Sequence, residues 1–110
     1  MPKIRLTPNI PLPAVFEYKE LQFFFYSHEH TPVHIHVRAD GCESKAIFIF
    51  EKGNLLKIKI AEAKNKKPLT GIRRKDMEEF LAKYALNITQ KWIDYFIYHK
   101  PLGREVIENF

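Results

Sequence analysis

The sequence predicts a single α+β domain over residues 1–110, with a four-stranded, mostly antiparallel meander and two C-terminal helices packed on one face of that sheet. Three observations support this class. Residues 20–61 hold four short apolar or alternating stretches, residues 72–100 show helical spacing of apolar side chains, and 110 residues suit one hydrophobic core.

The first 15 residues are predicted to form an extended, proline-rich arm that lies against the domain. Proline fixes φ and lacks a backbone N–H donor, so this density of proline prevents a helix. The prolines of the arm are Pro2, Pro8, Pro11 and Pro13.

Four strands follow, because each stretch is either rich in aromatic and β-branched residues or alternates between apolar and polar ones. Asp40-Gly41 and Gly53-Asn54 have the composition of tight turns between antiparallel neighbours. The predicted strands are LQFFFY (21–26), VHIHV (33–37), AIFIF (46–50) and LLKIKI (55–60).

Two helices account for the rest of the core. The first is expected to start at Asp76 and to end near Asn87, which can also cap the second. Pro101 and Gly103 stop the second helix. The apolar stripes are Met77, Phe80, Leu81 and Tyr84 on the first helix, and Ile88, Trp92, Tyr95, Phe96 and His99 on the second.

Alternation along the strands predicts two different sheet faces. Val33, Ile35 and Val37 share one face, which the helices should cover, and His34 and His36 share the other. Lys57 and Lys59 alternate with apolar residues in the same way. We therefore expect the second face to be open and to display these two histidines and two lysines.

Charge and cysteine content restrict the partners and the compartment. The net charge of +5, from 18 basic and 13 acidic residues, favours an acidic partner such as RNA or a small acidic protein. Cys42 is the only cysteine, so an internal disulfide is excluded and a reducing, cytoplasmic location is predicted. The apolar runs are too short for a membrane span, and the N-terminus lacks the pattern of a signal peptide.

Four of the five histidines fall within residues 28–36. One interpretation is a site for a zinc-like divalent metal with His30, His34 and His36 as ligands and one open position that activates water. Glu29 would be a further ligand or a general base. His28 is a less favoured alternative to His30.

Two other interpretations of the histidine cluster remain open. In metal-free catalysis, His34 and His36 would act as acid and base, with Lys57 stabilising negative charge, to cleave a phosphodiester. Alternatively, the histidines are only the polar side of a half-exposed strand.

A second basic stretch, GIRRKD (71–76), places Arg73, Arg74 and Lys75 at or before a helix start, where cations oppose the helix dipole unless an anion is near. Together with Lys57 and Lys59, these residues are candidate contacts for RNA or for a small acidic partner protein.

The stretch HEHTPVHIHV resembles the prokaryotic family called domain of unknown function 4160, whose motif is Asp-His-x-Pro-Pro-His-x-His-Val. Glu29 stands at the position of the aspartate, Val33 replaces the second proline, and KWIDYF (91–96) resembles the helical end of the family. The resemblance covers roughly residues 20–98. It implies a small cytoplasmic α+β protein, often encoded beside another small domain in a toxin–antitoxin-like pair, and it implies that His30, His34 and His36 act together.

The prediction for function is therefore a histidine-centred site, metal-binding or acid–base, with hydrolase or nuclease-like action on RNA or another phosphodiester. The alternative is a non-enzymatic binding module, or a toxin–antitoxin-like component, that docks a small acidic partner protein.

Overall fold

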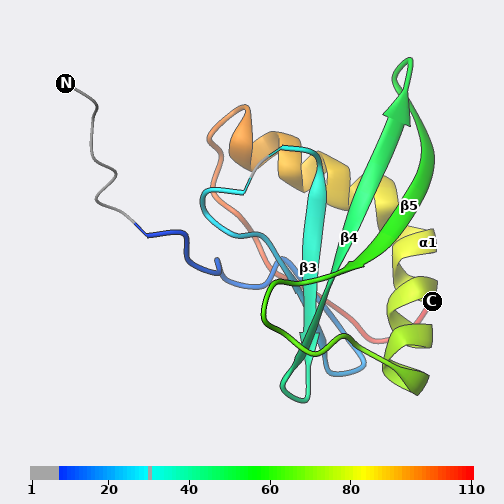
Figure 1. Ribbon diagram of the computed structural model, residues 1–110. Coiled ribbons are helices and arrows are strands. Elements are labelled where there is room, and N and C mark those ends of the chain that lie inside the picture. Colours follow the sequence, from blue (N-terminus) through cyan, green and yellow to red (C-terminus); the bar gives the residue numbers. More distant parts are fainter. Residues whose placement is uncertain (1–7, 30) are drawn as a thin grey trace.

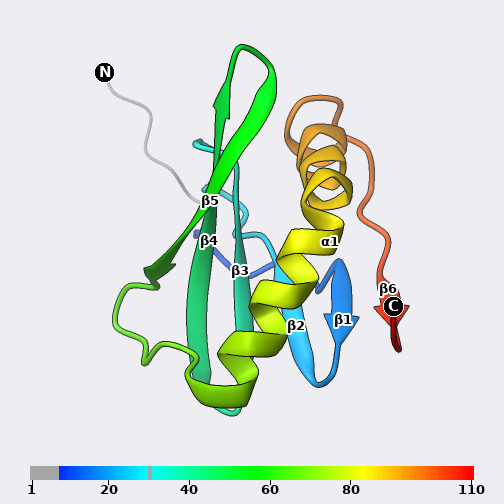
Figure 2. The same ribbon diagram turned by 90° about the vertical axis from the view of Figure 1, so that its right-hand side faces the viewer.

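The structure, a computed structural model, describes residues 8–29 and 31–110 and has the predicted α+β class. Its elements are β1 (Phe16–Tyr18), β2 (Leu21–Phe24), β3 (His34–Ala39), β4 (Cys42–Glu51), β5 (Asn54–Glu62), α1 (Gly71–Phe96) and β6 (Glu105–Ile107). The strands form one sheet in the order β5-β4-β3-β2-β1-β6, and α1 crosses one of its faces (Figures 1 and 2).

The four predicted strands correspond to β2, β3, β4 and β5, which pair in chain order as an antiparallel meander. Asp40 and Gly41 form the turn between β3 and β4, and their φ values of 53° and 76° fit the twist of a two-residue hairpin. The second turn differs from the prediction by one residue. Lys52 and Gly53 have the positive φ values, and Asn54 already belongs to β5.

The prediction of only four strands is wrong, because β1 and β6 extend the sheet. β1 pairs antiparallel with β2, and β6 returns from the end of α1 to lie parallel to β1, which makes the sheet mixed. Each strand has three residues, too few for a recognisable alternation. Their place in the sheet is set by long-range pairing, which local sequence does not reveal.

The prediction of two helices is not matched exactly, since α1 is one element over Gly71–Phe96 with a kink inside it. The backbone bends at Tyr84, whose φ of −110° and ψ of 15° are not helical, and continues past Asn87. Asn87 is exposed, whereas Ile88 is fully buried and continues the apolar stripe across the expected boundary. The helix also starts five residues before the expected Asp76.

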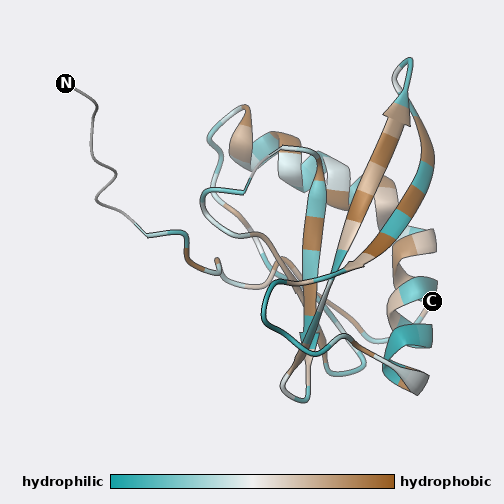
Figure 3. Ribbon diagram, in the orientation of Figure 1, coloured by the Kyte–Doolittle hydropathy of each residue, from teal (hydrophilic) through white to brown (hydrophobic). Residues whose placement is uncertain are grey.

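The core lies between α1 and the sheet face that carries the aliphatic side chains of β3. The ring of Phe80 on α1 stacks on Phe23 of β2, with centroids 4.4 Å apart, and on Tyr84 at 4.5 Å. Ile35 and Val37 are fully buried in the same cluster, as their alternation predicts. Figure 3 shows the resulting bands of hydrophobic and hydrophilic residues along β3, β4 and β5.

The described part of the proline-rich arm, residues 8–15, runs beside β2 and the segment that follows it. The backbone N–H of Leu12 donates a hydrogen bond to the carbonyl of Phe25, at 2.8 Å. Residues 1–7, with Pro2, lie outside the described residues. The arm thus extends the hydrogen bonding of the sheet toward the connection between β2 and β3.

Candidate metal centre

β3 brings His34 and His36 to the sheet face opposite α1, because side chains two residues apart on a strand point the same way. Their cross-strand partners on β4 are Ile47 and Lys45, respectively. The expectation that this face is open is wrong at the histidines, since only 6% of His34 and 4% of His36 is exposed. The connection between β2 and β3 covers them with residues that the strand pattern does not place.

Glu29, on that connection, points its carboxylate at both rings. Its Oε1 lies 3.0 Å from His36 Nε2 and 3.4 Å from His34 Nε2. One ligand atom from each of these three residues lies within 4.8 Å of the others, so the group could hold a metal ion. His30, the third ligand predicted from the sequence, lies outside the described residues.

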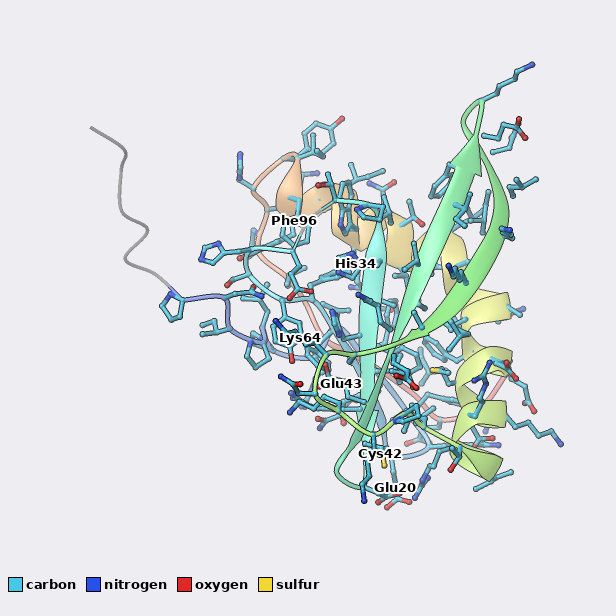
Figure 4. All side chains as sticks on the ribbon, in the orientation of Figure 1. Glu20, His34, Cys42, Glu43, Lys64 and Phe96 are labelled. Atoms are coloured by element: carbon cyan, nitrogen blue, oxygen red, sulfur yellow. The ribbon has the colours of Figure 1, made fainter. Side chains whose placement is uncertain are left out.

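The other nitrogen of each ring is engaged in a way that fixes the direction of Nε2. His34 Nδ1 donates to the carbonyl oxygen of Pro32 at 2.7 Å, and His36 Nδ1 contacts Glu43 Oε2 at 3.0 Å. The hydroxyl of Tyr26 donates to the same Glu43 oxygen at 3.1 Å. Metal-binding histidines typically donate from their second nitrogen to a carbonyl or a carboxylate in this manner. Figure 4 labels His34 on β3 and Glu43 on the neighbouring strand β4.

The proline-rich arm orients the Glu29 carboxylate. Asn9 Nδ2 donates to Glu29 Oε2 at 2.6 Å, and Asn9 Oδ1 accepts from the backbone N–H of His28 at 2.9 Å. One arm residue therefore holds both the side chain and the local backbone of the connection. Because Oε2 is bonded to Asn9, Oε1 is the oxygen left to face the histidines.

The environment favours a neutral ring at His36 and an ionised carboxyl at Glu29. Burial lowers the pKa of His36, although the nearby Glu29 and Glu43 carboxylates act in the opposite direction. Burial alone would raise the pKa of Glu29, but hydrogen bonds from Asn9, His36 and His34 outweigh it and lower that pKa. A neutral ring and an ionised carboxylate are the forms in which these groups bind metal ions.

A cavity of about 270 Å³ adjoins two of the three candidate ligands. Glu29 and His34 line it, so a bound ion would have an accessible side as well as three protein ligands. The remaining residues of its wall are His28, Thr31, Pro32, Lys45 and Ile47.

Lys57 and Lys59 occupy β5 on the same sheet face as the histidines, and both are exposed. Lys59 pairs across the strands with Ile47 and Lys57 with Ile49, so β4 separates both lysines from β3. The described wall of the cavity includes Lys45 but neither of these two. The catalytic role of Lys57 stays a prediction.

The basic residues at the start of α1 are distributed differently. The guanidinium of Arg73 forms ion pairs of 2.8 Å with Glu20 and with Asp40, which offset its unfavourable position in the first helical turn. Arg74 pairs with Glu78 at 3.3 Å, one turn along the helix. Lys75 is exposed. Contact of these residues with RNA or an acidic partner stays a prediction.

Four residues of the centre were not predicted: Asn9, Tyr26, Glu43 and Lys45. The sequence does contain a feature that predicts the positions of Glu43 and Lys45. A two-residue turn at Asp40-Gly41 sets Ala39 opposite Cys42 and thereby fixes the register of β3 against β4. That register puts Lys45 opposite His36, with Glu43 on its diagonal. Asn9 and Tyr26 carry no such signal.

No helix in the described part of the chain is both long and apolar enough to span a membrane. Comparison with curated proteins finds no match, and comparison with solved structures finds none either. The model of one family, described as Domain of unknown function (DUF4160), matches residues 21–93, which is more than half of the chain. The match spans β2 to β5 and most of α1, together with all three candidate ligands. The chain therefore belongs to the DUF4160 family.

Proposed function

We propose that Glu29, His34 and His36 bind one divalent metal ion and that the protein uses it to hydrolyse a phosphodiester. The observation that carries the proposal is the convergence of one ligand atom from each of Glu29, His34 and His36 within 4.8 Å beside a cavity. Two histidines and one carboxylate with an open position form the ligand set of one class of catalytic zinc sites.

The arrangement of partners behind the ligands supports the same conclusion. Nδ1 of His34 contacts the Pro32 carbonyl and Nδ1 of His36 contacts Glu43, so both Nε2 atoms face Glu29 Oε1. A divalent ion held by the three residues would take the place of the Nε2 protons that donate to Glu29, while the Nδ1 contacts keep both rings oriented.

A divalent ion lowers the pKa of bound water enough to make it a nucleophile near neutral pH. In hydrolysis, the water oxygen attacks phosphorus, the bond from phosphorus to the leaving oxygen breaks, and a proton is transferred to that oxygen. RNA is the phosphodiester that we expect, because Lys57 and Lys59 lie on the same sheet face as the centre.

The experiment is metal analysis and zinc titration of protein without a histidine tag, beside the double variant His34→Ala/His36→Ala. We expect one zinc or similar ion per chain, and loss of binding in a double variant that remains folded by circular dichroism. Zinc-dependent cleavage of bis-p-nitrophenyl phosphate and of a single-stranded RNA oligonucleotide then tests the chemistry. Wild-type protein that takes up no divalent ion would refute the proposal.

A further inference from the structure

The cavity beside the candidate metal centre is lined by a cation for which the described residues supply no ion-pair partner. Lys45 lines this cavity together with Glu29 and His34. Its position opposite His36 in the β3–β4 register places it on the same sheet face as both histidines. Within the described residues, Lys45 forms no ion pair and no side-chain hydrogen bond.

The formal charges around the candidate centre show how Lys45 changes the net charge of the site. A divalent ion bound to the Glu29 carboxylate leaves one net positive charge, and the Glu43 carboxylate behind His36 cancels it. Tyr26 adds no charge, because burial and the neighbouring Glu43 raise its pKa to about 12. Lys45 therefore decides whether the loaded site is neutral or cationic toward a ligand in the cavity.

We propose that Lys45 and the metal ion together bind one phosphoryl group, so that the site takes phosphate esters as its substrate class. The inference rests on the metal-binding function proposed above. A phosphoryl group has several anionic oxygens around one atom, so one oxygen can contact the ion while another contacts an ammonium group. Lysine binds phosphate as a compact point charge and needs no fixed plane of approach.

The size of the cavity limits what enters it. Sites for drug-sized ligands measure roughly 300–1,000 Å³, and this cavity has about 270 Å³. That volume has room for a phosphoryl group with part of its ester, and a longer substrate would extend beyond the cavity. Ile47 pairs with Lys59 across the strands, so the wall of the cavity continues onto the β5 surface, where the remainder of a longer ester would lie.

The test is a titration of cobalt-loaded protein with inorganic phosphate, followed by the visible absorption of the cobalt ion. The variant is Lys45→Met, which removes the charge and keeps most of the length of the side chain. Lys83→Met, on the exposed surface of α1, makes the same change of net charge away from the centre. Cobalt affinity is measured first for all three proteins.

We expect the three proteins to bind cobalt, with Lys45→Met at least as tight as the wild type because a nearby cation is gone. Phosphate should bind Lys45→Met about tenfold more weakly or worse, the loss typical of one charge-assisted hydrogen bond. Lys83→Met should match the wild type.

Two results would overturn the inference. If all three cobalt-loaded proteins bind phosphate equally, or none binds it, Lys45 is not the anion contact, and the metal site itself still stands. If the wild type binds no cobalt, the proposed metal site fails and the inference fails with it.

Discussion

Replacing Glu29 by glutamine tests whether the carboxylate is a metal ligand, because the amide keeps the shape of the side chain and removes its charge. Zinc sites with four protein ligands bind with apparent free energies of about 10–16 kcal/mol, so one ligand accounts for roughly 2.5–4 kcal/mol. Glu29 is one of the three residues that could hold the ion. We therefore expect Glu29→Gln to weaken zinc binding by about 100-fold or more, at 1.4 kcal/mol for each factor of ten.

Thermal unfolding with and without zinc measures this loss of zinc affinity as a smaller increase in Tm. Zinc at 100 times the wild-type dissociation constant stabilises the folded state by about 2.7 kcal/mol. For a domain of this size, that raises Tm by roughly 10 °C. The same zinc concentration would only equal the dissociation constant of Glu29→Gln, which leaves about 0.4 kcal/mol and a shift of about 2 °C.

Glu51→Gln is the matched control, since Glu51 is exposed at the end of the β4–β5 hairpin that projects from the sheet (Figure 1). It should keep the full zinc shift. The reasoning is refuted if Glu29→Gln keeps that shift as well, because the histidines would then bind the ion without the carboxylate.

Three further predictions concern the support of the site and the core. Asn9→Ala should weaken zinc affinity by about tenfold in calorimetry, because Asn9 donates a hydrogen bond of 2.6 Å to Glu29 Oε2 and so orients this carboxylate. An unchanged affinity would mean that Glu29 is oriented without the arm. Burial, and then the charge of Glu43, raise the pKa of Tyr26 from 10.0 to about 12, so folding favours the protonated phenol. Its contribution to stability is complete below pH 10 and is lost as the pH rises toward 12; tyrosinate absorbance should show one late-titrating tyrosine that Tyr26→Phe removes, and early titration of all five would contradict this. Phe80→Ala should lower the free energy of unfolding, measured in urea, by about 3–5 kcal/mol, because the ring is fully buried and stacks on Phe23 at 4.4 Å. A loss below about 1 kcal/mol would show that this ring is not central to the hydrophobic core.

The meander and its two faces could be predicted because their signals are local. Val33, Ile35 and Val37 alternate with two histidines, and Asp40-Gly41 is a turn by composition alone. These features require only the period of a strand and the conformational preference of the turn residues. β1 and β6 lack such a signal, since three residues pair only because distant partners hold them in place.

The single helix shows where a local signal was given too much weight. Asn87 resembles a cap, but it points to solvent on a surface where its propensity costs little. Ile88 and Trp92 are buried, and the chain stays helical past Asn87. The bend falls instead at Tyr84, whose ring packs on Phe80. Tertiary packing, and not the capping propensity of Asn87, therefore sets where α1 bends.

The candidate site was only partly predictable for a similar reason. Strand alternation places His34 and His36 together, whatever the rest of the fold does. The direction of Glu29 depends on a connection without regular structure and on Asn9, twenty residues away in the chain. Glu43 lies beyond a turn, and its contact with His36 follows only from the register that the turn sets.

The contact between the arm and Glu29 has a thermodynamic consequence for the centre. Asn9 lies outside the segment that the family model matches, yet it bonds to a candidate metal ligand inside that segment. If docking of the arm tightens metal binding by some factor, metal binding must tighten docking of the arm by the same factor. The backbone amide of His28, which donates to Asn9, should then exchange its hydrogen more slowly in the zinc-loaded protein. If the proposed ion binds, the arm and the ion are coupled ligands of one site, and residues that never touch the ion can change its affinity.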